Sequence, residues 1–234
     1  MSDGLIATEL FPDRLTGELA QRVLAMGAGK RLPSERRMAE ELGVSRTALR
    51  DRLTHLESLG VLERRTGSGT YVRGVRPDTV TEALGLGLLA SHLTFASLYS
   101  VRVALERQAA YEAALAGDPV KTAHMAAAVK RMEATEDGQE LYEADVAFHR
   151  ALFTASCSPA LEFFADALSG VLSRSVQQRQ QHIMRMTGDI GHMRQLHRDI
   201  HLAAAAEDPE RAMRAVDSHF VWLDQGLGGG RESG

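Results

Sequence analysis

The chain has a single cysteine and no long apolar run. Because Cys157 stands alone among 234 residues, no internal disulfide can form, which fits a reducing compartment. The first residues, MSDGLIATELFPDRL, lack a basic stretch followed by an apolar one, which argues against a signal peptide. No segment approaches the roughly 20 apolar residues that cross a membrane. We therefore expect a cytoplasmic protein without a membrane span.

Charge is distributed unevenly along the chain. The formal net charge is −4, which by itself speaks against nucleic-acid binding. Between Lys30 and Arg73, however, ten basic residues stand against six acidic ones. The acidic excess therefore lies mostly after residue 75. A locally basic module joined to an acidic remainder fits DNA binding confined to one domain.

Residues 32–59 have the pattern of two short helices joined by a tight turn. Ser34 predicts the N-cap of the first helix, Gly43 begins the turn, and Ser45 caps the second helix. The apolar side of the second helix is formed by Leu49, Leu53, Leu56 and Leu59. Three polar residues near its start lie off that side: Arg46, Thr47 and Arg50. In a helix-turn-helix, this end meets base edges and phosphates in the major groove.

A glycine-rich hairpin follows. Residues 61–65 and 70–73 have the composition of two short strands around residues 66–69. Backbone N–H groups and arginines of such a wing can approach the phosphate backbone or the minor groove. Each basic residue alone could belong to a solvated face, and some helix-turn-helix proteins bind no DNA. The ordered set of cap, turn, arginine-bearing helix and hairpin is more specific, and it predicts a winged helix-turn-helix that binds double-stranded DNA.

This first domain resembles the N-terminal domain of the GntR family of bacterial regulators. The resemblance rests on the stretches LPSER, GVSRTALR and GSGTYV. It departs slightly at Arg37-Met38, where the family often has an acid before an apolar residue. The resemblance implies DNA contacts by Arg36, Ser45, Arg46, Thr47, Arg50, Gly67 and Ser68.

Beyond residues 74–78 the strand signals disappear. We place a domain boundary here, with the winged helix-turn-helix over residues 1–75, an all-helical domain over 76–227 and a disordered tail over 228–234. Gly, Asp and Pro punctuation predicts helices over residues 79–91, 95–116, 119–135, 139–156, 159–185, 189–206 and 208–225. The expected fold class is mainly α, a winged helix-turn-helix followed by an all-α bundle.

Spaced acidic and histidine side chains could hold a metal in the second domain. Asp145 and His149 stand four residues apart, so on a helix they share one face. With His197 and His219 on later helices, they form a ligand set suited to a divalent transition metal. Spacing alone does not select this set, because most histidines are surface or hydrogen-bonded residues. Three others are available: His182, His192 and His201.

The second domain resembles the FadR-type C-terminal ligand-binding domain called FCD. The resemblance is carried by LYSVRVALERQAA, DVAFHRALF, QLHRDIH and a late SHF. It implies a metal held by Asp145, His149, His197 and His219. Zinc is favoured, and nickel, manganese and iron also accept such ligands. His201 then becomes a pocket or structural residue.

Arg102 has two interpretations. It precedes Glu106 by four residues on a predicted helix, which predicts an i,i+4 ion pair worth a few tenths of a kcal/mol. The FCD resemblance implies instead an anchor for an effector carboxylate, which an arginine can grip at two points. Lactate, glycolate, pyruvate and sugar acids would all suit such an anchor.

Together these features predict a homodimeric repressor that is not an enzyme. The dimer would bind a pseudo-palindromic operator and release it when a small organic acid binds near the metal. Three alternatives stay open: a regulator that responds to the metal alone, an acyl-CoA sensor, and a zinc-dependent hydrolase. The chain contains no HExxH motif, which speaks against the hydrolase.

Overall fold

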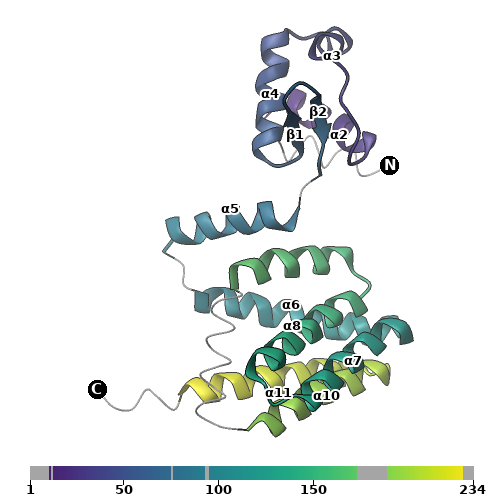
Figure 1. The fold of residues 1–234 in the computed structure, drawn as a ribbon, viewed down its shortest axis with the longest axis vertical. Coiled ribbons are helices and arrows are strands. Elements are labelled where there is room, and N and C mark those ends of the chain that lie inside the picture. The colour runs from purple at the N-terminus through teal and green to yellow at the C-terminus, as the bar shows by residue number, and fades with distance from the viewer. Residues whose placement is uncertain (1–10, 12, 75, 93–94, 173–188, 229–234) are drawn as a thin grey trace. The chain divides into compact units, whose positions relative to one another are not determined.

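The computed structural model describes residues 11, 13–74, 76–92, 95–172 and 189–228. The chain divides into two compact units, Met1–Val80 and Thr81–Gly234, so the division falls five residues after the predicted boundary. Helices dominate both units (Figure 1), and the predicted fold class is confirmed. None of the helices in the described ranges has the length and apolarity to cross a membrane.

The first unit is a winged helix-turn-helix. It contains α2 (Arg14–Met26), α3 (Glu35–Leu42), α4 (Arg46–Ser58), β1 (Leu62–Arg65) and β2 (Gly69–Val72). The side chains of Ser34 and Ser45 accept hydrogen bonds from backbone N–H groups three residues on, which confirms both predicted N-caps. Gly43 ends α3 with φ 65°, a left-handed conformation that glycine adopts without strain.

Leucines of α4 hold this unit together. Leu49, Leu53 and Leu56 are buried, but Leu59 is 39% exposed. The prediction that Leu59 continues the buried side is wrong, because α4 ends at Ser58 and Leu59 lies beyond its last helical residue. The buried leucines pack with α2 and both strands in one core, which fixes α4 against the hairpin.

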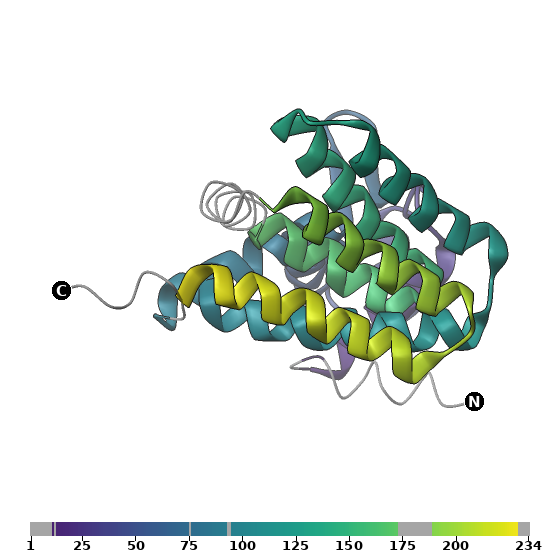
Figure 2. The ribbon, with the colours of Figure 1, turned by 90° about the horizontal axis from the view of Figure 1, so that it is seen from below.

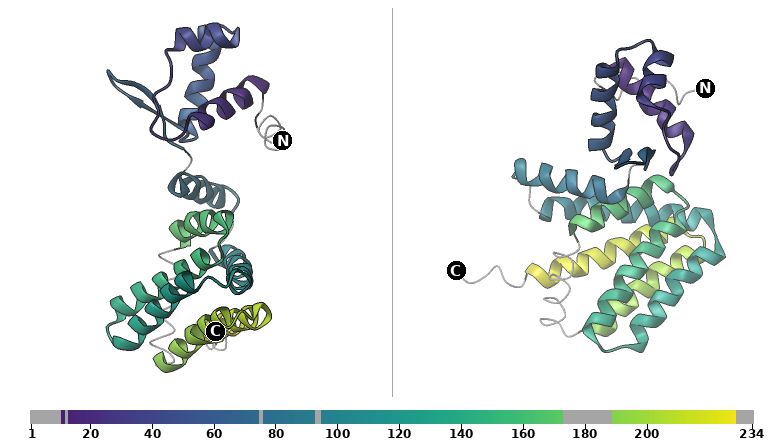
Figure 3. Two further views of the ribbon diagram at one scale, coloured as in Figure 1. Left: turned by 90° about the vertical axis from the view of Figure 1, so that its right-hand side faces the viewer. Right: turned by 45° about the horizontal axis from the view of Figure 1, so that its top comes forward.

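The hairpin is antiparallel, with Leu62 opposite Val72 and Arg65 opposite Gly69. Figure 3 shows it projecting from the helices of its unit. Arg31 forms an additional bridge opposite Tyr71, so the segment before α3 extends the small sheet.

All regular secondary structure among the described residues of the second unit is α-helix. Its elements are α5 (Pro77–Ala90, which contains the division between units), α6 (Phe95–Ala116), α7 (Pro119–Ala134), α8 (Gly138–Ala155), residues 159–172, α10 (Ile190–Ala205) and α11 (Pro209–Gly228). Asp118, Asp137 and Asp189 cap α7, α8 and α10, and they lie at breaks between helices that the sequence predicted. Residues 173–185 of the predicted helix 159–185, and 229–234 of the predicted tail, lie outside the described residues.

Five helices form the bundle core. α8 packs against α6 and α7, while α10 packs against α6, α7 and α11, and α11 also packs against α6. Figure 2 shows α10 and α11 lying side by side. Small buried residues let these helices approach closely: Ala109, Ala113, Ala144, Ala203 and Ala212. Polar side chains in the middle of α6, α8, α10 and α11 are therefore enclosed together.

Candidate functional site

The start of α4 presents an exposed polar surface. Ser45, Arg46, Thr47 and Arg50 are all exposed, as is Arg36 on α3. Ser45 also caps α4, accepting a hydrogen bond from the Ala48 N–H at 3.1 Å. Arg50 pairs with Glu35 of α3 at 2.8 Å, so an acid across the turn holds its guanidinium. This end of α4 can offer arginine forks to bases or phosphates.

The wing is braced by an aromatic side chain. The hydroxyls of Tyr71 and Ser68 share a hydrogen bond of 2.7 Å, and the Arg65 guanidinium lies 4.4 Å from the centre of the Tyr71 ring. Gly69 has φ 120°, and a Cβ there would lie 2.8 Å from Nε of Arg31. Arg31 was not among the predicted DNA contacts. Its pairing opposite Tyr71 and its guanidinium against Gly69 place it at the wing, where Gly67 is exposed.

Three histidines meet in the middle of the helical unit. His149 comes from α8, His197 from α10 and His219 from α11, and one nitrogen of each lies within 4.8 Å of the others. All three are buried. Phe148 packs edge-on against His197 with ring centres 4.8 Å apart, and Phe220 packs edge-on against His219 at 5.1 Å. The apolar rings restrict how the imidazoles can turn.

Asp145 adjoins two of these rings. Its Oδ1 lies 2.9 Å from Nε2 of His197 and 3.6 Å from Nε2 of His149. His197 donates Nδ1–H to the Met193 carbonyl at 2.8 Å, so Nε2 of the neutral ring carries a lone pair directed away from that bond. Two acceptors facing each other at 2.9 Å require a cation nearby, either a proton or a metal.

The donor set fits a metal ion. Within the described chain, five buried histidine nitrogens have no hydrogen-bond partner: Nδ1 of His149, Nε2 of His197, Nδ1 of His201, and both nitrogens of His219. Those of His149 and His197 face carboxylate oxygens of Glu106 and Asp145 at 2.7 and 2.9 Å, so His219 is the cluster member with neither a hydrogen bond nor an ion pair in the described chain. Buried polar atoms left unpaired are costly, so a cluster of them needs an explanation. Ligands that each lie ~2.1 Å from one zinc are about 3.0–3.4 Å apart, close to the separations of Asp145 from His149 and His197. Unpaired nitrogens and ligand-like spacing together favour an ion at this place.

Glu106 of α6 completes the cluster and was not singled out from the sequence. Its Oε1 accepts a hydrogen bond from Nε of Arg102 at 2.6 Å, and its Oε2 lies 2.7 Å from Nδ1 of His149 in a buried ion pair. Burial raises the pKa of Glu106, but Arg102 and His149 outweigh it and bring the pKa to about 2. Glu106 is therefore a carboxylate that orients His149 and leaves Nε2 for a metal.

The surrounding charges act on the other buried groups. Burial lowers the pKa of His149, but Glu106 and Asp145 raise it to about 9. Burial raises the pKa of Asp145, yet His149 and His197 hold it well below its usual range. Burial, with His197 and His149 beside it, lowers the pKa of His219. In the metal-free protein His149 is cationic, so an ion that binds there must displace a proton.

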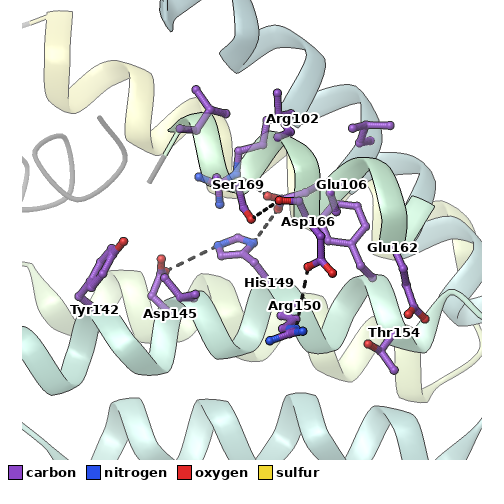
Figure 4. Close-up of a pocket in the computed structure, with 17 residues that line it drawn as sticks. Arg102, Glu106, Tyr142, Asp145, His149, Arg150, Thr154, Glu162, Asp166 and Ser169 are labelled. Atoms are coloured by element: carbon purple, nitrogen blue, oxygen red, sulfur yellow. Dashed lines mark hydrogen bonds and ion pairs between the residues drawn. The ribbon is translucent and has the colours of Figure 1, made fainter. Parts of the chain in front are cut away.

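A cavity of about 410 Å³ opens beside this cluster. Figure 4 shows Arg102, Glu106, Asp145 and His149 along its wall. The wall is made by α6, α8 and residues 159–172. Asp145 and His149 therefore belong both to the candidate metal centre and to the cavity, and a small molecule in the cavity could reach the ion.

Each of the two units matches a known protein family or domain. Residues 13–72 match the family described as bacterial regulatory proteins, gntR family, and residues 97–221 match the FCD domain. A protein of Escherichia coli K12 described as a regulator of the L-lactate dehydrogenase operon is 33% identical over 92% of this chain and 86% of its own.

The chain is a GntR-family transcriptional regulator. The HTH-type transcriptional regulator LutR of Bacillus subtilis is 29% identical, covering 86% of this regulator and 93% of LutR. A solved structure of Streptococcus agalactiae GntR shares the fold, with a TM-score of 0.65 at 24% identity, covering 90% of this chain and 99% of that one. The family comprises DNA-binding regulators rather than enzymes, which sets the hydrolase alternative aside.

Of the residues predicted for the metal, the structure groups His149, His197 and His219, and it places Asp145 against the first two. His201, one turn beyond His197, is outside this group. Arg102 lines the cavity of the regulator and pairs with Glu106. This is the ion pair that the four-residue spacing predicted, and it is buried.

We expect Glu106→Gln to weaken metal binding by the regulator by about 10–100-fold, because the carboxylate that orients His149 is lost. Competition with a chelating dye would measure the affinity. Glu112→Gln, on the same helix and paired with Gln108, is the matched control and should bind metal like the wild type. Equal affinities in the two variants would show that Glu106 does not support the centre.

Proposed function

We propose that this regulator is a homodimeric repressor that leaves its operator when a carboxylate effector binds beside a divalent metal in its FCD domain. The observation that carries the proposal is the sharing of Asp145 and His149 between the metal centre and the cavity. An effector in this cavity can contact the ion and the helices that hold it. Its different affinity for two domain arrangements would then change DNA binding.

The charges of the cavity explain why an ion would be needed. Four carboxylates line it: Glu106, Asp145, Glu162 and Asp166. Against them stand the guanidinium groups of Arg102 and Arg150. Protonated His149 adds a third positive charge in the metal-free protein, so four negative charges face three positive ones. An anionic effector would meet net repulsion from this wall, and a divalent ion that displaces the His149 proton raises the charge by one unit. When bound, the ion supplies a Lewis-acidic partner for the effector carboxylate.

The ligand set favours zinc. Three imidazoles and one carboxylate are common zinc ligands, and nickel, manganese and iron accept the same groups. His149, His197, His219 and Asp145 would hold the ion, with Glu106 supporting His149. This set also speaks against an acyl-CoA sensor, which requires no metal.

Arg102 is proposed as the anchor for the effector. Only one of its five N–H donors is used by the hydrogen bond to Glu106, and its side chain lines the cavity. The remaining donors can grip a carboxylate at two points. Because the pair with Glu106 is buried, removing Glu106 would leave the buried Arg102 charge without this partner at a cost of about 3–5 kcal/mol, whereas Glu106 without Arg102 would still face His149. Glu106 thus links the anchor to the metal ligand His149.

Dimer formation is supported by an exposed apolar surface. Leu86 and Leu89 of α5 are 69% and 78% exposed, and residues 83–101 contain no Asp, Glu, Lys or Arg. Such a patch is typical of a protein interface. A two-fold dimer would present two copies of the exposed end of α4 to a pseudo-palindromic operator, expected to be double-stranded DNA.

The proposal is tested with full-length protein and a DNA fragment that it selects from a random pool. We expect lactate or a longer carboxylate to lower DNA affinity of the zinc-loaded protein by about 5–150-fold, the usual range of allosteric coupling. Fluorescence anisotropy would measure it, and metal-free protein should not respond. If zinc alone changed DNA affinity and no carboxylate added to the effect, the regulator would be a metal sensor instead.

A further inference from the structure

The cavity is much larger than a small hydroxy acid requires. An engineered protein cavity of about 150 Å³ accommodates benzene, which has six non-hydrogen atoms. The cavity beside the metal centre measures about 410 Å³. By the same ratio it has room for roughly 16 non-hydrogen atoms, whereas lactate has six. A lactate molecule at the metal would leave most of the space to water.

The part of the cavity wall that lactate would leave uncovered is largely apolar. The cavity extends along one face of α8 from Tyr142 to Thr154, about 18 Å of helix at 1.5 Å per residue. Asp145 and His149 occupy only part of this face. Apolar side chains that line the cavity come from α6, α8 and residues 159–172: Leu105, Val146, Phe153, Ala165, Leu168 and Leu172. Water against this surface gains little, whereas hydrocarbon is stabilised there.

Acidic groups limit what the far part of the molecule can carry. Glu162 and Asp166 line the cavity from residues 159–172. Asp166 pairs with Arg150 at 4.0 Å, and the Arg150 side chain is largely exposed. A second carboxylate on the effector would approach these acids, so the wall disfavours a dicarboxylate.

We infer that the effector is a monocarboxylate with an apolar body, of about ten non-hydrogen atoms or more, rather than a two- or three-carbon hydroxy acid. Its carboxylate binds beside the metal and Arg102, and its body lies along Phe153, Ala165 and Leu168. The inference rests on the proposed function, since it assigns the ligand class of the same site. The cavity volume and its apolar lining set the length of the body, and Glu162 and Asp166 disfavour a second carboxylate on it.

Calorimetric titration of zinc-loaded full-length protein tests this with lactate, butanoate, octanoate and octanedioate. Each buried methylene adds about fourfold in affinity, so octanoate should bind about 100-fold or more tightly than butanoate. Octanedioate, with the same chain and a second carboxylate, should bind at least tenfold more weakly than octanoate. Lactate binding as tightly as octanoate would overturn the inference and leave the proposed function standing. Binding of none of the four acids would count against the proposed function itself.

Filling the apolar part supplies a second test. Ala165→Phe should lower octanoate affinity to about that of butanoate while the zinc content stays unchanged. Val146→Phe fills the cavity from α8 instead. Because the Val146 side chain is 44% exposed, a larger side chain there should disturb the fold less than one at Ala165. Octanoate affinity equal to the wild type in both variants would show that the apolar body does not lie in this cavity.

Discussion

Replacing His197 by alanine is expected to weaken metal binding by more than about 100-fold and to abolish the carboxylate response of DNA binding. His197 is fully buried, its Nδ1–H is committed to the Met193 carbonyl, and its Nε2 lies 2.9 Å from Asp145. Loss of a group that only orients a ligand costs 10–100-fold, and loss of a ligand should cost more. Metal content after dialysis and anisotropy with labelled DNA would measure the two effects.

His201→Ala is the matched control for that experiment. It lies on the same helix one turn further along, is less buried, and does not belong to the histidine group. We expect this variant to keep its metal and its carboxylate response. A full metal complement in His197→Ala, or equal loss in His201→Ala, would mean that the ligands have been assigned wrongly. Far-ultraviolet circular dichroism would show that both variants remain folded.

The double variant Arg46→Ala, Arg50→Ala should lose most of its specific DNA affinity. Each arginine that grips a base or phosphate at two points is worth ~1–3 kcal/mol, which for two amounts to roughly a 30- to 25,000-fold loss. Both side chains are exposed at the start of α4, so the fold should be unaffected. Metal content and carboxylate binding should also stay unchanged, because they depend on the other unit.

Arg214→Ala controls for the loss of positive charge. Arg214 lies on α11 and is largely exposed beside Glu210. Its removal should leave DNA affinity within about twofold of the wild type. DNA affinity in the double variant no weaker than in this control would show that α4 does not read the operator.

The first unit was largely predictable because its signals are local. Ser34 and Ser45 cap helices through backbone N–H groups three residues away, and the glycine-rich turn sets the hairpin. The error at Leu59 arose because its apolar spacing continues past Ser58, where the helix ends. The spacing of apolar residues cannot show where a helix ends when an apolar residue beyond its end happens to continue the spacing.

The metal centre was predictable only in part. Spacing on one helix relates Asp145 to His149, but His197 and His219 join them through the packing of three helices. Residue type made these two candidates, and only the family resemblance selected them over the other histidines. Glu106 was predicted only as an ion-pair partner of Arg102, since the sequence does not show which side of α6 faces α8. The cavity could not be foreseen either, because its volume depends on how residues 159–172 lie against α6 and α8.

Elemental analysis of full-length protein, purified without added metal or chelator, tests the central claim that the helical unit is built around a metal ion. The account predicts about one divalent metal per chain, with zinc the most abundant, and its loss in His219→Ala. Folded wild-type protein that contains no metal, and takes up none when zinc is added and the excess removed, would contradict it.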